Sequence, residues 1–153
     1  MLQLDQTDLK LLREIQREAR ISNVELSERL NLSPTPCLRR LRKLEDSGVI
    51  RGYETQLDST LLGFQISALA FVKLTRNSAD NAKDFEKQIQ NLAAVVECNV
   101  ITGAYDYVLR IVAKNLEDYE RILKNQLGVI RELADIESTI ILKQVECSKG
   151  LPL

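Results

Sequence analysis

Residues 22–50 read SNVELSERLNLSPTPCLRRLRKLEDSGVI, and this stretch decides the fold of the first part of the chain. Ser22 and Glu25 have the spacing of a capping box, in which two side chains satisfy free backbone N–H groups at the start of a helix. The pattern predicts a helix that ends at Leu30. Its apolar residues, which we expect to be buried, are Val24, Leu26 and Leu30.

The same stretch predicts a second helix directly after the first. Asn31 tolerates the left-handed backbone of a tight turn, and Ser33 is a typical N-cap residue. Pro34 follows at the first helical position, where a missing N–H has no cost, and Pro36 still lies in the first turn. Gly48 is a typical helix terminator. Two short helices joined by a tight turn indicate a helix-turn-helix.

An earlier helix completes the predicted first domain, residues 1–52. Asp5 precedes an apolar run and Asp8 stands three residues later, which predicts a capped helix start. The apolar residues of this helix recur at helical spacing: Leu9, Leu12, Ile15 and Ala19.

The helix that starts after Ser33 is predicted to have one apolar and one charged face. At about 100° per residue, the apolar face carries Cys37, Leu38, Leu41 and Leu44, and the opposite face carries Thr35, Arg39, Arg42, Lys43 and Asp46. A recognition helix needs this layout, because its first residues reach base edges while cations meet phosphates. The candidate DNA-binding residues are Ser33, Thr35, Pro36, Arg39, Arg40, Arg42 and Lys43. Arg40 lies at the flank of this face, where it can instead pair with an acid inside the domain. The alternative for the whole face is the solvated side of a small helical bundle.

The composition argues against several classes of protein. Hydrophobic residues make up 44% and charged residues 28% of the 153, which is typical of a globular protein. No apolar run reaches the ~18 residues of a membrane span, and the N-terminus has no basic-then-apolar signal, so we expect a cytoplasmic protein.

The chain contains no histidine, which excludes histidine-dependent catalysis. Its three cysteines, Cys37, Cys98 and Cys147, form no Cys-x-x-Cys pair. We expect neither a metal nor a cofactor. Cys37 shares an apolar helix face and is expected to be structural rather than redox-active.

Charge is distributed unevenly along the chain. Residues 1–52 hold ten Lys or Arg against eight Asp or Glu, whereas residues 53–153 hold eleven against fourteen. The first part is therefore slightly basic and the second acidic, although the net charge is −1. The basic excess coincides with the helix-turn-helix, which favours DNA as its partner.

The pattern changes after a predicted hinge at residues 53–64, which contains turn residues at Asp58-Ser59 and Gly63. The second predicted domain, residues 65–153, mixes period-two and helical patterns. Its predicted strands lie at 66–74, 95–102, 107–113 and 136–145, and its first predicted helix lies at 82–92. A second helix is predicted after Asn115, with Leu116, Tyr119 and Leu123 on one face and Gly128 as its stop.

This order is that of a ferredoxin-like βαββαβ domain, in which helices cover one face of an antiparallel sheet. Leu69 and Phe71 lie on the opposite face of the first strand from Ile66 and Val72. Because no helix of the chain covers that second face, we expect it to pack on another subunit and form at least a homodimer.

Several motifs of the first domain resemble one family. The segments Ile21–Ser27 (ISNVELS) and Leu32–Leu38 (LSPTPCL), and the pattern Arg40-x-x-Lys43-Leu44-Glu45-x-x-Gly48-Val49-Ile50, resemble the helix-turn-helix of leucine-responsive regulatory proteins, the Lrp/AsnC or feast/famine family. The resemblance implies an α+β chain, with an N-terminal winged-type helix-turn-helix and a C-terminal ferredoxin-like effector-binding domain. It implies binding to double-stranded operator DNA.

The resemblance extends into the second domain. Thr102–Tyr107 (TGAYDY) resembles the family's loop between the second and third strands, which implies an amino-acid pocket between dimers that often assemble into octamers. The implied effector residues are Gly103, Ala104, Tyr105, Asp106 and Tyr107, with Ser138, Thr139 and Ile140 from a neighbouring subunit. Many relatives carry an acid where this chain has Ala104. The resemblance, helped by the apolar Ala104 and Ile140, implies leucine or methionine as the effector.

The chemistry of the loop fits that role. An amino-acid pocket needs donors for the carboxylate and an acceptor for the ammonium group. Asp106 can accept from the ammonium directly or hold the loop in place, and Tyr105 and Tyr107 can form aromatic walls. The alternative is that the glycine and the aspartate only form a turn and that the tyrosines are core residues.

Two other functions remain open at this point. An architectural DNA-binding protein of the same fold would use the first domain and bind no effector. A small ferredoxin-like enzyme would need a catalytic constellation, and the sequence offers no histidine, metal cluster or paired carboxylates. We therefore predict that the protein is not an enzyme.

Overall fold

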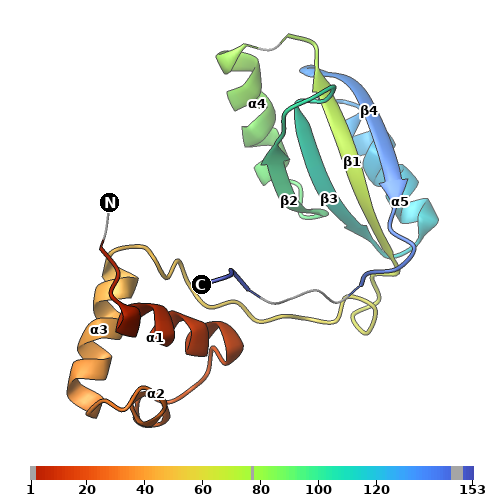
Figure 1. Cartoon of the computed structure of the whole chain (residues 1–153). Helices are drawn as coiled ribbons and strands as arrows, with labels where there is room; N and C mark the ends of the chain where they lie inside the picture. Colours follow the sequence, from red (N-terminus) through yellow and green to blue (C-terminus); the bar gives the residue numbers. More distant parts are fainter. Residues whose placement is uncertain (1–2, 77, 146–149) are drawn as a thin grey trace. The chain divides into compact units, whose positions relative to one another are not determined.

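The computed structural model describes residues 3–76, 78–145 and 150–153. The chain forms two compact units, Met1–Gln56 together with Glu146–Leu153, and Leu57–Val145 (Figure 1). Within the described residues, no helix is long and apolar enough to cross a membrane.

The first unit contains the three predicted helices, α1 (Gln6–Arg17), α2 (Asn23–Arg29) and α3 (Pro34–Asp46). Both predicted capping boxes form, Asp5 with Asp8 at α1 and Ser22 with Glu25 at α2. Asn31 makes the turn between α2 and α3 with a φ of 53°. These features confirm the helix-turn-helix.

The core of this unit is small. It consists of the buried side chains Leu11, Leu12, Leu26, Cys37 and Leu44. The expectation that Val24 is buried is wrong, since its side chain is 56% exposed. Two residues along a helix correspond to about 200°, so Val24 and the buried Leu26 point to opposite sides of α2. Burial raises the pKa of the Cys37 thiol, which agrees with a structural role.

The second unit has the predicted βαββαβ order. Its elements are β1 (Ile66–Leu74), α4 (Ala79–Gln90), β2 (Val95–Val100), β3 (Tyr107–Ala113), α5 (Leu116–Ile122), a π-helical turn η1 (Leu123–Leu127) and β4 (Leu133–Ile140). The antiparallel sheet has the order β2-β3-β1-β4 (Figure 1). Phe85 and Ile89 of α4 and Tyr119 and Ile122 of α5 pack in one core with the same side of the sheet.

The last strand differs from its prediction. We expected it at residues 136–145, but it begins at Leu133 and ends at Ile140. Leu133 pairs with Leu74 and Ile140 with Ala68, so β4 ends near the start of its partner β1. The N–H of Ile141 still bonds the carbonyl of Ser67 near the start of β1, but the next residue, Leu142, is 96% exposed.

The last helix also departs from expectation. Leu116, which we placed on the same face as the core residue Tyr119, is 61% exposed because it precedes the part of α5 that packs on the sheet, which starts at Tyr119. Beyond α5 the helix widens into η1, where the N–H of Gly128 bonds the carbonyl of Leu123 at 2.8 Å. The wider turn places Leu127 in the core.

Within Leu57–Val145, the described helices pack on one face of the sheet and leave its second face open. Ala68, Ala70 and Val72 are buried beneath the helices, whereas Leu69 and Phe71 are only half-buried on the other side. Their cross-strand neighbours on this open face are Val108, Arg110, Glu137 and Thr139.

Candidate DNA interface and effector site

The start of α3 presents polar groups that its own helix does not use. Ser33 occupies the N-cap position, but its side chain makes no capping hydrogen bond. The reason is local: Pro34 and Pro36 have no N–H to offer, so Thr35 is the one residue among the first three helical positions with a backbone donor. The exposed side chains of Ser33 and Thr35 are therefore not drawn into a cap. They lie where a recognition helix meets base edges or phosphates.

Cations follow on the same side of α3. Arg39, Arg42 and Lys43 are exposed and line a shallow surface hollow together with Thr35, Leu38, Asp46 and Ser47. We expected Leu38 to belong to the apolar face, but it is half-buried and lines this hollow. It stands four residues before Arg42, about 40° away around the helix, so it borders the cationic side.

Arg40 belongs to the interior of the domain rather than to this surface. Its guanidinium lies 2.5 Å from Asp5 and 2.7 Å from Asp8, whose side chain is only 2% exposed. The pKa of Asp5 is lowered, first by the backbone N–H of Asp8 and then by Arg40. The two expectations for Arg40 are thus resolved in favour of an ion pair within the domain. The sequence carried one sign of this pairing, because Asp8 falls on the same helical side as Leu12.

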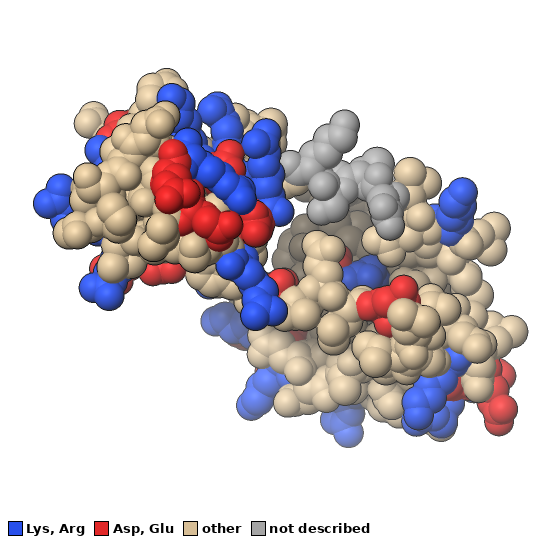
Figure 2. Space-filling model, turned by 90° about the horizontal axis from the view of Figure 1, so that it is seen from below, with Lys and Arg blue, Asp and Glu red and all other residues tan. Residues whose placement is uncertain are grey.

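Two other arginines of the first unit, Arg17 and Arg29, pair with acids of α1 and its C-cap. Arg29 of α2 lies 3.2 Å from Glu14 and 2.8 Å from Glu18, both near the end of α1. Figure 2 shows carboxylates and cations side by side on the part of this unit that faces the viewer. Three exposed cations of α3, Arg39, Arg42 and Lys43, by contrast gather in one surface hollow.

The predicted effector loop, Gly103–Tyr107, is tied to the end of β1. The backbone N–H of Asp106 bonds the carbonyl of Val72 at 2.9 Å, and its carboxylate accepts the N–H of Leu74 at 2.8 Å. The register of β1 shifts between Lys73 and Leu74, and the carboxylate satisfies a donor at that irregularity. Gly103 has a φ of 120°, a conformation that favours glycine. In this structure Asp106 fixes the loop.

The two tyrosines of the loop lie on opposite faces of the sheet. The Tyr105 hydroxyl donates to Glu137 on β4, and its ring lies 5.7 Å from that of Phe71 on the open face. Tyr107 is 3% exposed and its hydroxyl donates to Glu86 of α4 at 2.8 Å. Burial, followed by the bond to Glu86, raises the pKa of Tyr107. Within this chain the two rings therefore do not line one surface, and Tyr107 is a core residue.

The β4 residues of the predicted site are exposed but do not share a face. Thr139 pairs with Leu69 on the open face, while Ser138 and Ile140 pair with Ala70 and Ala68 and point to the other side. The loop is bonded to Val72, four residues further along β1 than the partner of Ile140. Four residues of extended chain span roughly 13 Å. One subunit alone therefore does not bring the two halves of the predicted site together.

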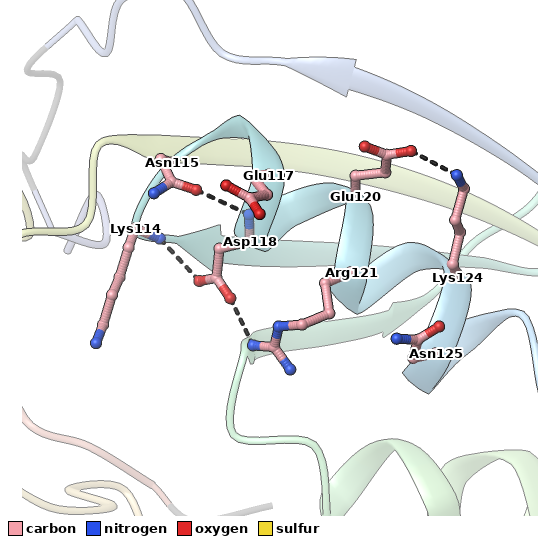
Figure 3. Close-up of a pocket in the computed structure, with 8 residues that line it drawn as sticks. All are labelled: Lys114, Asn115, Glu117, Asp118, Glu120, Arg121, Lys124 and Asn125. Carbon is pink, nitrogen blue, oxygen red and sulfur yellow. Dashed lines mark hydrogen bonds and ion pairs between the residues drawn. The ribbon is translucent and has the colours of Figure 1, made fainter.

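Another hollow lies beside α5 (Figure 3). It contains none of the predicted site residues, and its charges bond one another: Arg121 lies 2.5 Å from Asp118, and Lys124 lies 2.5 Å from Glu120. The pKa of Asp118 is lowered by the backbone N–H of Lys114 and then by Arg121. These local pairs involve four of the charged residues in the hollow, and we assign it no ligand.

Sequence reasoning missed the partners of the tyrosines. Glu86 and Glu137 are separated from Tyr107 and Tyr105 by 21 and 32 residues. No local spacing connects such pairs, because they depend on how the strands and α4 pack.

Comparisons with known proteins agree with both units. Residues 4–51 match the family described as winged helix-turn-helix DNA-binding, and residues 67–151 match the Lrp/AsnC ligand binding domain. The chain is 37% identical over 145 residues to a leucine-responsive regulatory protein of Rhizobium meliloti (strain 1021), covering 95% of this chain and 93% of the relative. It is 32% identical over 152 residues to the transcriptional regulator AzlB of Bacillus subtilis (strain 168), covering 99% and 97%.

Solved structures give the same result. A transcriptional regulator from Neisseria meningitidis, crystallised as a complex with L-Met, superposes with a TM-score of 0.92 at 34% identity, covering 98% of this chain and 97% of that one. An AsnC family transcriptional regulator from Agrobacterium tumefaciens gives 0.89 at 29% identity, covering 97% of each. The predicted fold class is confirmed, and so is the expectation that the protein is not an enzyme. The chain belongs to the Lrp/AsnC family of DNA-binding transcription regulators.

Proposed function

We propose that this regulator reads specific operator sequences through α3 and that a free apolar amino acid, leucine or methionine, modulates its binding. DNA binding is supported mainly by how the cations of α3 divide between the interior of the domain and its exposed surface. Arg40 is held by Asp5 and Asp8, whereas Arg39, Arg42 and Lys43 remain on the exposed side with Thr35. A DNA-binding domain also supports a cytoplasmic location.

The exposed residues have different roles in this proposal. Thr35 and Arg39, nearer the helix start, contact base edges, and Arg42 and Lys43 contact phosphates. A dimer presents two such helices, which should reach half-sites about one helical turn, ~34 Å, or a multiple of it apart.

The amino acid is expected at the loop Gly103–Tyr107. The anchored carboxylate of Asp106 and the exposed Ala104 support this location, since the first fixes the loop and the second leaves an apolar surface. Two kinds of relative support the choice of side chain: several are named leucine-responsive regulatory proteins, and one was crystallised with L-Met. Ser138–Ile140 of a neighbouring subunit would close the site, in agreement with their separation from the loop within one chain.

Assembly follows from the same geometry. The open sheet face around Leu69 and Phe71 is proposed to pair with itself in a C2 homodimer, and dimers that share effector sites would assemble further, to an octamer. A ligand at a site between dimers would shift assembly or operator affinity.

The DNA half is tested with duplexes selected from a random library, at several salt concentrations. Thr35→Ala and Arg39→Ala should reduce discrimination between selected and random DNA by roughly 1–3 kcal/mol per lost base contact. Lys43→Ala should weaken binding to selected and to random DNA alike. It should also flatten the dependence of affinity on salt concentration, because a protein that contacts one phosphate fewer releases fewer counterions. Lys10→Ala, which removes an exposed cation from α1, is the matched control. Equal effects of all the α3 variants on both kinds of DNA would exclude the proposed reading face.

The effector half is tested by calorimetry against the free amino acids. Leucine or methionine should bind the wild type, and Asp106→Asn should bind about ten- to a hundredfold more weakly, because the charged hydrogen-bonding group that holds the loop is lost. The measurement is repeated with operator DNA, since coupling between two ligands is reciprocal. No heat with any amino acid would indicate an architectural DNA-binding protein without an effector.

A further inference from the structure

The segment Gly150–Leu153 lies against helix α1 of the DNA-binding unit. The backbone N–H of Leu151 donates to the Gln16 side-chain oxygen at 2.5 Å, and the Gln16 amide donates back to the Leu151 carbonyl at 3.3 Å. Arg13 donates to the carbonyl of Leu153 at 2.7 Å. The segment follows β4 in the chain, yet it groups with the helices of the first unit.

These contacts have the character of a small peptide site. Arg13 and Gln16 stand three residues apart, so their side chains emerge from the same side of α1. Gln16 offers one donor and one acceptor to the backbone N–H and carbonyl of a single residue, Leu151, as a neighbouring strand would. Around Pro152 the tail turns tightly, with the Leu153 N–H bonded to the Leu151 carbonyl at 2.9 Å. The turn returns the chain to Arg13, and the fixed φ of proline reduces the entropy lost on docking.

Gly150 restricts which peptide sequences can occupy this site. Its φ is 65°, a region that favours glycine, and a Cβ atom placed there would lie 2.4 Å from Oε1 and 2.9 Å from Cδ of Gln16. Any other residue at this position would both strain the backbone and displace the side chain that holds Leu151.

We propose that Arg13 and Gln16 of α1 form a docking site for the Gly150–Leu153 segment of this chain, and that the docked tail is a second tether on the DNA-binding domain. The first tether is the linker that follows α3. A domain held at two points samples fewer orientations than one held by a single flexible linker, so a dimer should tolerate fewer half-site spacings. This functional consequence rests on the proposed operator binding, whereas docking itself does not.

Hydrogen exchange of the full-length protein tests docking without DNA or amino acid. The Leu151 and Leu153 amides should exchange slowly in the wild type, and about fivefold faster or more in Gln16→Ala and in Gly150→Ala, since each change removes hydrogen bonds of ordinary strength. Arg17→Ala, which removes an exposed arginine from the same helix, should leave the tail protected. Unprotected tail amides in the wild type, or equal exchange in wild type and Gln16→Ala, would overturn the docking site.

Operator spacing tests the second tether. Five base pairs inserted between half-sites should lower wild-type affinity about tenfold, and only about two- to threefold in Gly150→Ala, whose reading face is intact. An equal loss in both proteins would overturn the tethering role. A wild type that binds no operator would contradict the proposed function, and the exchange experiment would still decide docking.

Discussion

Replacing Arg40 by alanine should weaken the DNA-binding domain without changing how it reads DNA. The guanidinium of Arg40 is the cation that faces Asp8, and it also bonds Asp5, so it joins α3 to the start of α1. In Arg40→Ala the Asp8 carboxylate stays in place, with a side chain only 2% exposed. The Asp8 side chain is then left buried without its cationic partner, although the backbone N–H of Asp5 still donates to it.

The size of the effect follows from burial. Removing one partner of a fully buried ion pair costs about 3–5 kcal/mol, and an exposed pair contributes about 0–1 kcal/mol. Because Asp8 is buried while the Arg40 side chain is 32% exposed, we expect an intermediate loss of about 2–3 kcal/mol. Arg42→Ala, at an exposed position of the same helix, should stay within about 0.5 kcal/mol of the wild type.

Native-state hydrogen exchange measures this loss locally. Amides of α1 and α3 should exchange about 30- to 150-fold faster in Arg40→Ala, the equivalent of the expected loss in opening free energy. Adding Asp8→Asn should recover part of the protection, because it removes the uncompensated charge. The ratio of selected to random DNA affinity should be unchanged. Suppose instead that amide exchange were unaffected and that the ratio of selected to random DNA affinity fell as in Arg39→Ala. Arg40 would then contact DNA, and its proposed role as an ion-pair residue inside the domain would be refuted.

Two further predictions concern assembly and acid stability. If the protein forms the proposed dimer, Phe71→Asp should convert it to a monomer in sedimentation experiments, because the change places a charge on the open sheet face. Leu116→Asp, at an exposed helix position, should stay dimeric, and a dimeric Phe71→Asp would exclude that face. The lowered pKa of Asp5 means that its contribution to stability is present above 3.8, the ordinary value, and is lost as the pH falls further through the folded-state pKa. Denaturation of the helical unit monitored from pH 5 to pH 2 should therefore show declining stability, and a flat profile would contradict the hydrogen bonds assigned to Asp5.

Local signals in the sequence predicted the helix starts well. The capping boxes of Asp5 with Asp8 and of Ser22 with Glu25 act within a single turn, so their chemistry can be recognised from spacing alone. The strand order also followed, because the alternation of patterns leaves few topologies for a chain of this length. By contrast, β4 ends near the start of its partner strand β1. The β-branched residues around Ile140 do not reveal this end, because it depends on the pairing of two distant segments.

The candidate sites show the same division. The exposed side of α3 follows from helical periodicity, but the pairing of Arg40 with Asp8 joins residues 32 positions apart and could be offered only as an alternative. Tyr105 and Tyr107 stand two residues apart, yet the chain enters β3 between them and they end on opposite faces. The predicted effector site also includes residues of a second subunit, whose placement depends on assembly rather than on this chain alone.

The π-helical turn η1 has a consequence for variation in chain length. A turn that closes from Gly128 to Leu123 contains one residue more than an α-helical turn. A deletion of one residue between Leu123 and Leu127 could therefore be absorbed by converting the turn to regular α-helix, with Ile122 and Leu127 still facing the core. Glycine would then no longer be needed at position 128. In the wide turn a Cβ atom at Gly128 would lie 3.1 Å from the carbonyl oxygen of Leu123, and this close contact depends on the π-helical geometry. We therefore expect the protein to tolerate the deletion of one residue in this turn without a rearrangement of the sheet.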